Sequence, residues 1–379
     1  MHMKTIVRSA LLSICAVTAV QAAPFMAIGD GAELFATGAL GVRSDDNIFL
    51  AKDATSDVIF NVDPGLELTF GKDAQVKGSL TLVDSISRYS DNSNLNTNLF
   101  STNFVSSYED GKLKLGFTAG YQETNQNTVD VRAPGGGALI RRNALSAGAT
   151  AESEVSEITS VAAGFSYTKT DYKRAGFGDS EDYTIPLNFY YKWTPKVDLS
   201  LGYRYRAYQT QIGQDSTDHF FNVGARGEFT PKLTGQVQVG WTQRQLTNGV
   251  RENLVGLDAN LTYAISPKTS LQLRTANSPD SSPSGAQQKN FSLGGTLSTN
   301  ISDQWSVNAG LSYRGITYVG TASSAERTDD YIEGTVGATY VVNQYIRVAG
   351  TYAYRSNSSK ISSSDFTNNV FSLSANIRY

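Results

Sequence analysis

Short segments in which apolar and polar residues alternate run along most of this chain. In "NVFSLSANIRY", residues 369–379, one face carries Phe371, Leu373, Ala375, Ile377 and Tyr379, and the other carries serine, asparagine and arginine. The segments "VDLSLGYRYRAY" and "GQVQVGWTQR" follow the same rule. A period of two is that of a β-strand with one apolar and one polar face. The pattern therefore predicts an all-β chain.

Two kinds of break separate these segments, and they alternate. The first is a tight turn of the type "EDGK" or "TPKV", in which Asp-Gly or Pro favours a reversal of the chain. Such turns begin 36 to 44 residues apart, at 71–74, 109–112, 153–157, 194–197, 230–233, 266–269, 302–305 and 343–345. The second is longer and polar, for example at 90–97, 126–141, 174–181, 212–217, 278–288 and 357–368.

Tight turns that alternate with long loops, around segments of about ten residues, are typical of transmembrane β-barrels. Eight tight turns and nine long breaks predict about 18 strands in one up-and-down antiparallel barrel, residues 23–379. Short turns would face the periplasm and long loops the exterior. The terminal strand would close the ring against a first strand near 32–42, which leaves no open edge in lipid. A secreted soluble β-protein is the alternative.

Aromatic residues mark the strand ends beside the tight turns. Rings at the water boundary form the girdles of outer-membrane barrels. The predicted girdle residues are Phe70, Tyr108, Trp193, Phe229, Tyr263, Trp305, Tyr340 and Tyr379.

The N-terminal segment has the pattern of an export signal. Lys4 and Arg8 precede an apolar stretch, and "VQAA" offers a small-residue cleavage site. We therefore expect residues 1–22 to be a signal peptide and the mature chain to lie in the outer membrane of a bacterium. Cys15, the single cysteine, lies in this segment, so disulfides and thiol chemistry are not expected.

Composition supports one apolar face per strand. The hydrophobic fraction is 40% and the charged fraction is 18%. The chain therefore has too few apolar residues to fill two soluble cores, and it has too little charge to be disordered. Without Lys4 and Arg8, the 32 basic residues fall to 30 against 35 acidic ones, so the mature net charge is −5.

The face opposite the apolar set would line a lumen. An 18-strand barrel is wider than its side chains can fill, so a water channel is expected. The predicted basic lumen residues are Lys77, Lys114, Lys192, Arg204, Arg206, Arg226, Arg244, Arg274, Arg314, Arg347, Arg355 and Arg378. The acidic ones are Asp63, Glu67, Glu152, Glu228, Asp258 and Glu333.

This excess, 12 against 6, would favour anions or an acidic glycan, because charges in a confined pore focus the field. Alternatively, the arginines pair with acids across strands and hold the wall in shape. Tyr190 and Tyr208 could stack on sugar rings. "RAPGGGALIRR", residues 132–142, is either a surface loop or a constriction loop folded into the mouth.

Enzymatic chemistry has little support. The mature chain has one histidine, His219, with Asp215, Ser216 and Asp218 near it in sequence. A lipase-like Ser-His pair is the remote alternative, but no serine has a nucleophile motif. We therefore predict no enzyme, no cofactor and no metal. No exposed basic run suggests nucleic acid as a partner.

The stretch "GVRSDDNIFLAKDATSDVIFNVDPGLELTFGK", residues 41–72, carries a family pattern. The pattern has three parts. The first is Asp46, Asn47, Ile48 and Phe49, the second is Ser56 and Asp57, and the third is Pro-Gly-Leu at 64–66. This stretch resembles the outer-membrane β-barrel porins of the second type, which include proteins encoded with exopolysaccharide gene clusters. The resemblance implies a barrel with a porin-like or polysaccharide-export role and no catalytic residue.

Three function classes follow. The first is a channel for small anions or (poly)saccharide; the second is a non-conducting anchor or receptor barrel; the remote third is a lipid hydrolase. Expected partners are outer-membrane lipid, lipopolysaccharide and the transported solute. A C-terminal strand ending in an aromatic also resembles the signal read by the barrel-assembly machinery. Because only about 15 residues of the mature chain precede the first strand, we expect no periplasmic scaffold domain.

Overall fold

The computed structural model describes residues 24–29, 31–132, 136–320 and 326–379. The predicted signal peptide, with Lys4, Arg8 and Cys15, lies outside the described residues. None of the helices among the described residues is long and apolar enough to cross a membrane. Two 3-10 helices, η1 (Ser93–Leu95) and η2 (Ser362–Ser364), are single turns in loops.

Strands make up most of the described chain. They are β1 (Met26–Ile28), β2 (Ala32–Asp45), β3 (Asp57–Phe70), β4 (Val76–Tyr89), β5 (Thr97–Asp110), β6 (Leu113–Asn125), β7 (Arg141–Ser156), β8 (Thr159–Tyr172), β9 (Ser180–Thr194), β10 (Val197–Thr210), β11 (Ser216–Thr230), β12 (Leu233–Leu246), β13 (Arg251–Ser266), β14 (Thr269–Ser281), β15 (Gln287–Asn300), β16 (Trp305–Tyr318), β17 (Arg327–Val341), β18 (Ile346–Ser359) and β19 (Phe366–Arg378).

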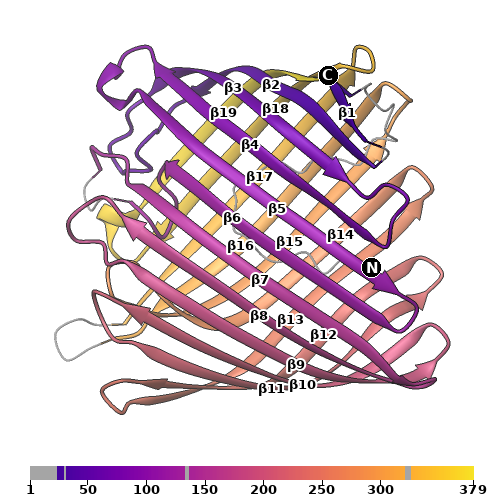
Figure 1. The fold of residues 1–379 in the computed structure, drawn as a ribbon. Coiled ribbons are helices and arrows are strands. Elements are labelled where there is room, and N and C mark those ends of the chain that lie inside the picture. The colour runs from indigo at the N-terminus through magenta and orange to yellow at the C-terminus, as the bar shows by residue number, and fades with distance from the viewer. Residues whose placement is uncertain (1–23, 30, 133–135, 321–325) are drawn as a thin grey trace.

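The strands β2 to β19 form a closed antiparallel barrel. Each pairs with the next along the chain, and β19 pairs with β2. In Figure 1 the strands run obliquely around the barrel, with short connections at one end and longer ones at the other. Because β1 is a three-residue addition to β2, the ring itself has 18 strands within the described residues. The predicted fold, strand number and closure are confirmed.

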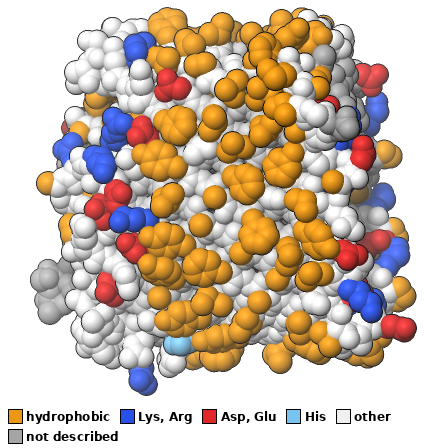
Figure 2. Space-filling model, in the orientation of Figure 1, with side chains coloured by type: hydrophobic (Ala, Val, Ile, Leu, Met, Phe, Trp, Pro, Cys, Tyr) orange, Lys and Arg blue, Asp and Glu red, His pale blue; other side chains and the backbone are white. Residues whose placement is uncertain are grey.

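Alternating side chains give the wall its two faces. Val58, Phe60, Val62 and Leu66 on β3 are exposed on the outside, and the residues of the opposite face, such as Ile59 and Asn61, are more covered. Figure 2 shows apolar side chains over the middle of the wall, with charged side chains gathered at the two ends. An apolar outer band between two polar ends is what a membrane-spanning barrel requires.

The strands are longer than the sequence predicted at the long-loop end. β11 begins at Ser216, β14 continues to Ser281 and β19 begins at Phe366, all inside predicted loops. These segments are rich in Ser, Asp and Asn, which in sequence resemble loop residues. They pair as strands because neighbouring strands supply the ladder hydrogen bonds, whatever their side chains.

Buried amides lock the seam between β19 and β2. The Nδ2 of Asn368 donates to Oδ1 of Asp45 at 2.7 Å and to Oδ1 of Asp46 at 3.3 Å. The Nδ2 of Asn47 donates to the carbonyls of Ala51 and Thr367 at 2.7 and 2.8 Å. Asn47 and Asn368 are fully buried. The Asp-Asn step that carried the family resemblance therefore joins the two ends of the ring.

Replacing Asn47 with alanine should lower the stability of the barrel by about 1–3 kcal/mol, because buried partners lose their hydrogen bonds. Those partners include the Thr367 carbonyl and the Ala51 amide. The urea midpoint in lipid vesicles would report the loss. Asn376→Ala is the control, since that side chain only donates to the nearby Ser374 hydroxyl. Equal midpoints for Asn47→Ala and wild type would contradict the role.

Backbone hydrogen bonds and ring contacts hold the end of β19 in place. Tyr379 exchanges two backbone hydrogen bonds with Ala36, at 2.7 and 2.9 Å. Beyond that point β1 pairs with the start of β2, from Met26 opposite Leu34 to Ile28 opposite Ala32. β1 therefore continues the row of strands where β19 stops, and the Phe25 ring lies 6.4 Å from the Tyr379 ring. Few backbone groups of β2 are left without a partner.

Candidate functional site

Several ion pairs join strands that are not neighbours in the ring. Arg226 on β11 bonds Glu152 on β7, with Nη1 to Oε2 at 2.9 Å. Arg206 on β10 lies 3.1 Å from Asp280 on β14. Side chains on such strands can meet only across the inside of the barrel, so these residues face the lumen.

Arg226 is the centre of one lumen cluster. Its guanidinium contacts Glu152 and lies 3.0 Å from the Asp198 carboxylate. The same guanidinium lies 3.3 Å from the centre of the Tyr190 ring. Tyr190 is 2% exposed and Tyr208 is 7% exposed. The prediction that these two tyrosines stack on sugar rings is therefore wrong, because Tyr190 is covered by Arg226 and Tyr208 is buried beside Arg206.

A second cluster lies toward the long-loop end of β10 to β14. Arg244 makes a two-pronged contact with Asp218, both hydrogen bonds being 2.7 Å. Arg206 lies 2.7 Å from Asp182 and also reaches Asp218 and Asp280. The charged groups of this corner are thus paired with one another, and Arg244 and Asp218 are buried as in a core.

The other predicted lumen residues fall into two sets. Paired ones contact an opposite charge at 2.5 to 3.4 Å: Lys114–Glu109, Arg204–Asp258, Glu228–Lys196, Arg314–Asp130, Arg355–Glu333 and Arg378–Glu67. Among the described residues, Lys77, Lys192, Arg274, Arg347 and Asp63 have no ion pair within 4 Å. Lys77, Lys192 and Arg274 are exposed, and the Lys192 ammonium donates to the Glu157 carbonyl.

The predicted basic excess is wrong in size, because the sequence missed acids that contact lumen arginines. These are Asp130, Asp182, Asp198, Asp218 and Asp280. Each of these five acids neutralises part of the charge of the lumen arginine that it contacts. Asp130 and Asp280 lie in segments assigned to loops in the sequence, so the alternation could not show which way their side chains point. Asp182, Asp198 and Asp218 lie at or next to strand ends, where the alternating pattern begins. The arrangement favours the alternative in which the arginines pair with acids across strands and hold the wall in shape.

The described part of the loop 126–140, which is 126–132 and 136–140, folds across the mouth of the barrel. Asp130 in this loop contacts Arg314 on β16 at 2.5 Å. β7, which follows the loop, and β16 are nine positions apart in the ring of 18, so they lie on opposite sides. The loop therefore crosses the lumen, and of the two alternatives for 132–142, the described part fits the one folded inward.

Two other loops hold this loop in place. Asn127 donates to the Phe49 carbonyl at 2.9 Å, and Arg132 donates to the carbonyls of Leu50 and Ser364 at 3.0 and 2.7 Å. Burial lowers the pKa of the Arg132 guanidinium, although its charge remains at any physiological pH. Leu139 packs on a buried cluster around Ile48 and Phe49. The loops 46–56, 126–140 and 360–365 thus form one unit over the mouth.

A separate set of loops meets over the packed corner. The Gly178 amide donates to the Pro283 carbonyl at 2.8 Å. Gly213 and Gly285 have φ of +100° and +89°, and a Cβ on Gly213 would lie 2.6 Å from Gly285 Cα. Only glycine allows two backbones to approach so closely in this conformation. The mouth is therefore narrowed from two sides.

The predicted aromatic residues lie at strand ends beside the short connections. Trp193 and Tyr379 are 67% and 51% exposed, and the Trp305 and Tyr340 rings lie 4.9 Å apart. Their membrane role stays a prediction. The sequence analysis missed a second row near the long-loop end, which contains Tyr121, Tyr167, Tyr183 and Tyr313. These tyrosines stand among polar residues such as Glu181, whose carboxylate accepts from the Tyr183 hydroxyl.

The two rows are separated by a membrane thickness. On β9, Tyr183 and Trp193 are ten residues apart. At about 3.3 Å per residue and a tilt of about 40°, this corresponds to a height of about 25 Å, which is that of the apolar band of outer-membrane barrels.

His219 does not meet the serine near it in sequence. Its Nδ1 is 2.8 Å from the Tyr203 hydroxyl, on the outer face. Ser216 and Asp218 are buried on the opposite face of the same strand, since they differ from His219 by odd numbers of residues. The described residues contain no group of three or more His, Cys, Asp or Glu placed to hold a metal ion.

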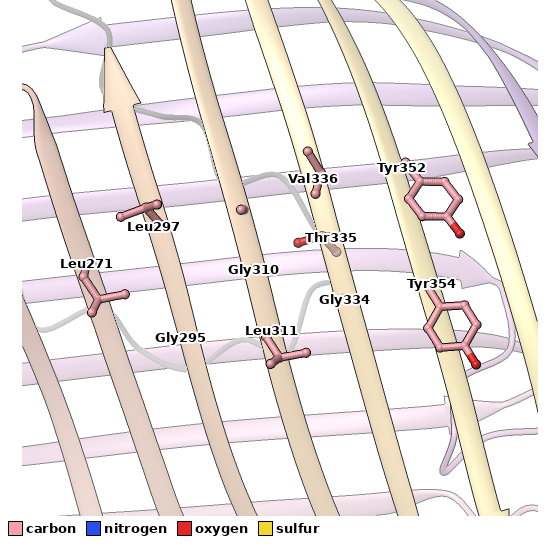
Figure 3. Close-up of a pocket in the computed structure, with 11 residues that line it drawn as sticks. Leu271, Gly295, Leu297, Gly310, Leu311, Gly334, Thr335, Val336, Tyr352 and Tyr354 are labelled. Carbon is pink, nitrogen blue, oxygen red and sulfur yellow. The ribbon is translucent and has the colours of Figure 1, made fainter. Parts of the chain in front are cut away.

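An apolar groove of about 480 Å³ crosses the outer face of β14 to β18. Figure 3 shows Gly295, Gly310 and Gly334 between the side chains of Leu271, Leu297, Leu311 and Val336, with Tyr352 and Tyr354 at one side. This hollow faces away from the lumen and takes no part in the polar site.

The closed ring, the polar interior and the apolar outer band define a transmembrane β-barrel of the outer-membrane type. Residues 206–379 match the family described as "Putative beta-barrel porin 2". This match covers a little under half of the chain and is consistent with the family resemblance noted in the sequence, although it does not include residues 41–72. No curated protein matches the sequence.

A search of solved structures found matches of low sequence identity. The ferric citrate transporter FecA in its unliganded form is 12% identical with a TM-score of 0.44, and the match covers 86% of this chain. The chain spans only 60% of the length of FecA. Pseudomonas aeruginosa OpdK is 11% identical (TM-score 0.48; 92% and 99% of the two chains covered). Acinetobacter baumannii OccAB2 is 9% identical (TM-score 0.49; 92% and 98%).

Proposed function

We propose that this protein is an outer-membrane channel through which small polar solutes, saccharides among them, diffuse. The observation that carries the proposal is the closed ring of 18 strands with a polar inner face, since a ring of this size has room for water. A porin family match over residues 206–379 supports the same class. In this proposal residues 1–22 direct export and the barrel-assembly machinery recognises β19.

The proposed channel has little charge selectivity. Most lumen arginines already contact a carboxylate, so the field at the axis is weaker than the sequence count suggested. Arg274 is one of the unpaired basic residues, and it supports a residual preference for anions, including acidic sugars. It is exposed on the lumen side of β14, and among the described residues it has no carboxylate within 4 Å.

A non-conducting anchor or receptor barrel is the second candidate. The loops that meet across the mouth favour it, because Asp130–Arg314 and Gly178–Pro283 both join distant strands. A link to exopolysaccharide export rests on the family resemblance.

Planar bilayers would decide between the two candidates. We expect steady ohmic conductance with a reversal potential close to zero in a salt gradient, and Arg274→Glu should shift that potential toward cation selectivity, because it reverses an unpaired lumen charge. Arg88→Glu is the matched control, because it makes the same change of charge at an exposed residue that lies opposite Phe60 on the outer face. Absence of conductance from folded protein would contradict the channel, and an unmoved potential would contradict the role of Arg274. Swelling of liposomes in sugar solutions would test saccharide passage.

A further inference from the structure

The groove on β14 to β18 lies in the apolar band of the wall. Leu311 and Val336, at its rim, are 65% and 54% exposed. Along their strands, the lining residues lie two to eight positions from the ends beside the short connections, from Leu271 to Tyr354. If the short turns face the periplasm, the groove opens into the periplasmic leaflet.

Gly334 lies at the floor of the groove, and the backbone of the barrel does not require a glycine at this position. A Cβ there would meet no atom within 4 Å, and the backbone is not in a positive-φ conformation. At Gly295 the nearest atom would be the end of the Leu273 side chain at 3.4 Å. Glycine weakens a strand compared with residues that have side chains, so a larger apolar residue would suit an ordinary lipid-facing position better.

The size of the groove excludes a protein as its natural occupant. A stable protein interface buries about 1,200 Å² or more, whereas this groove is a narrow hollow between side chains of five strands. Its walls are apolar, and the groove is continuous with the surface that already faces acyl chains. A single flexible hydrocarbon chain fits both its shape and its surroundings.

The periplasmic end of the groove offers groups for a phospholipid head. Lys268 is exposed in the turn that precedes β14, and its carbonyl accepts from the Asn300 amide at 2.9 Å. The next residue, Ile301, is bonded to Trp305, whose ring packs on Tyr340. The Lys268 ammonium has no ion pair within 4 Å among the described residues; the exposed Asp303 lies in the adjacent turn.

We propose that the groove binds one phospholipid of the periplasmic leaflet as an ordered lipid. One acyl chain lies over Gly295 and Gly334, the glycerol region meets the Trp305–Tyr340 pair, and Lys268 binds the phosphate. Rings of this kind sit at the headgroup level of membranes, and an ammonium pairs well with phosphate. The inference needs only the barrel's position in the membrane and does not depend on conductance.

Native mass spectrometry of the barrel, extracted from outer membranes in mild detergent, tests the proposal. We expect wild type to retain one phospholipid, Gly334→Leu to lose most of it by filling the floor, and Lys268→Glu to retain less. Gly350→Leu is the matched control, because Gly350 is also open to a Cβ, lies on the same outer face and does not line the groove. Gel mobility before and after heating shows that each variant is folded.

Three results would overturn the proposal. Equal lipid retention by wild type and Gly334→Leu would show that the groove does not select a lipid. Lipopolysaccharide as the retained molecule would place the site in the other leaflet. A wild-type dimer that Gly334→Leu converts to monomer would make a second copy the occupant. A barrel that fails to conduct but retains the phospholipid would contradict only the proposed channel function.

Discussion

Replacing Arg244 with alanine should lower the free energy of unfolding by about 3–5 kcal/mol, the usual cost of removing one partner from a buried ion pair. Arg244 is 1% exposed, and Asp218, which it holds with two hydrogen bonds, is 5% exposed. Without the guanidinium, the Asp218 carboxylate would keep only Arg206 at 3.7 Å. Denaturant unfolding in lipid vesicles, followed by tryptophan fluorescence, would measure the change.

Two variants make this test specific. Arg274→Ala removes an exposed, unpaired arginine from the same inner wall, and its effect should stay within about 0.5 kcal/mol. Combining Arg244→Met with Asp218→Asn removes both charges and should recover most of the lost stability. If Arg244→Ala unfolded at the same denaturant concentration as wild type, the packed corner would not be a source of stability.

Replacing Arg314 with alanine should raise the single-channel conductance several-fold. The Asp130–Arg314 contact joins the described part of the loop 126–140 to the far wall, so its loss should let the segment around Asp130 move away from that wall, while Asn127 and Arg132 keep the rest of the loop in place. The narrowest part of a pore dominates its resistance, and a wider mouth therefore passes more current. Planar-bilayer recordings at one salt concentration would show the change, with noisier open levels as the loop moves.

Arg355→Ala is the control for this experiment. Arg355 pairs with Glu333 on the neighbouring strand, so its loss should leave the loop and the conductance nearly unchanged. Protease sensitivity of the loop would show independently whether Arg314→Ala releases it. A released loop with unchanged current would mean that the constriction lies elsewhere. A silent wild type and a conducting Arg314→Ala variant would show that the loop is a plug.

The strands and turns could be predicted from sequence because their signals are local. Two-residue alternation in 369–379 and Pro or Asp-Gly in the tight turns depend on near neighbours alone, and both predicted the observed elements. The outer row of tyrosines was missed for the same reason. Tyr183 lies between Asp182 and Thr184, so its surroundings in sequence resemble a loop although its ring lies on the outer wall.

The contacts inside the barrel could not be predicted, because they join residues that are far apart in the chain. Asp130 and Arg314 are separated by 184 positions, and nothing in either segment indicates the other. The alternating pattern predicted that Arg226 points into the lumen. It did not predict that Arg226 pairs with Glu152 on another part of the wall or that its guanidinium covers the Tyr190 ring. Predicted counts of lumen charge therefore overestimated the field, since pairing depends on how the ring is folded around its interior.

The seam has a consequence for how the molecule is made. Asp45 and Asn368 are 323 positions apart, so a nascent chain that lacks its final hairpin exposes two unpaired edges, on β2 and on the last strand made. Such edges attract other strands, and pairing between remote segments forms slowly. We therefore expect the unfinished chain to need protection from other strands until the two edges pair. A chain truncated before its last strand should aggregate instead of closing a smaller barrel.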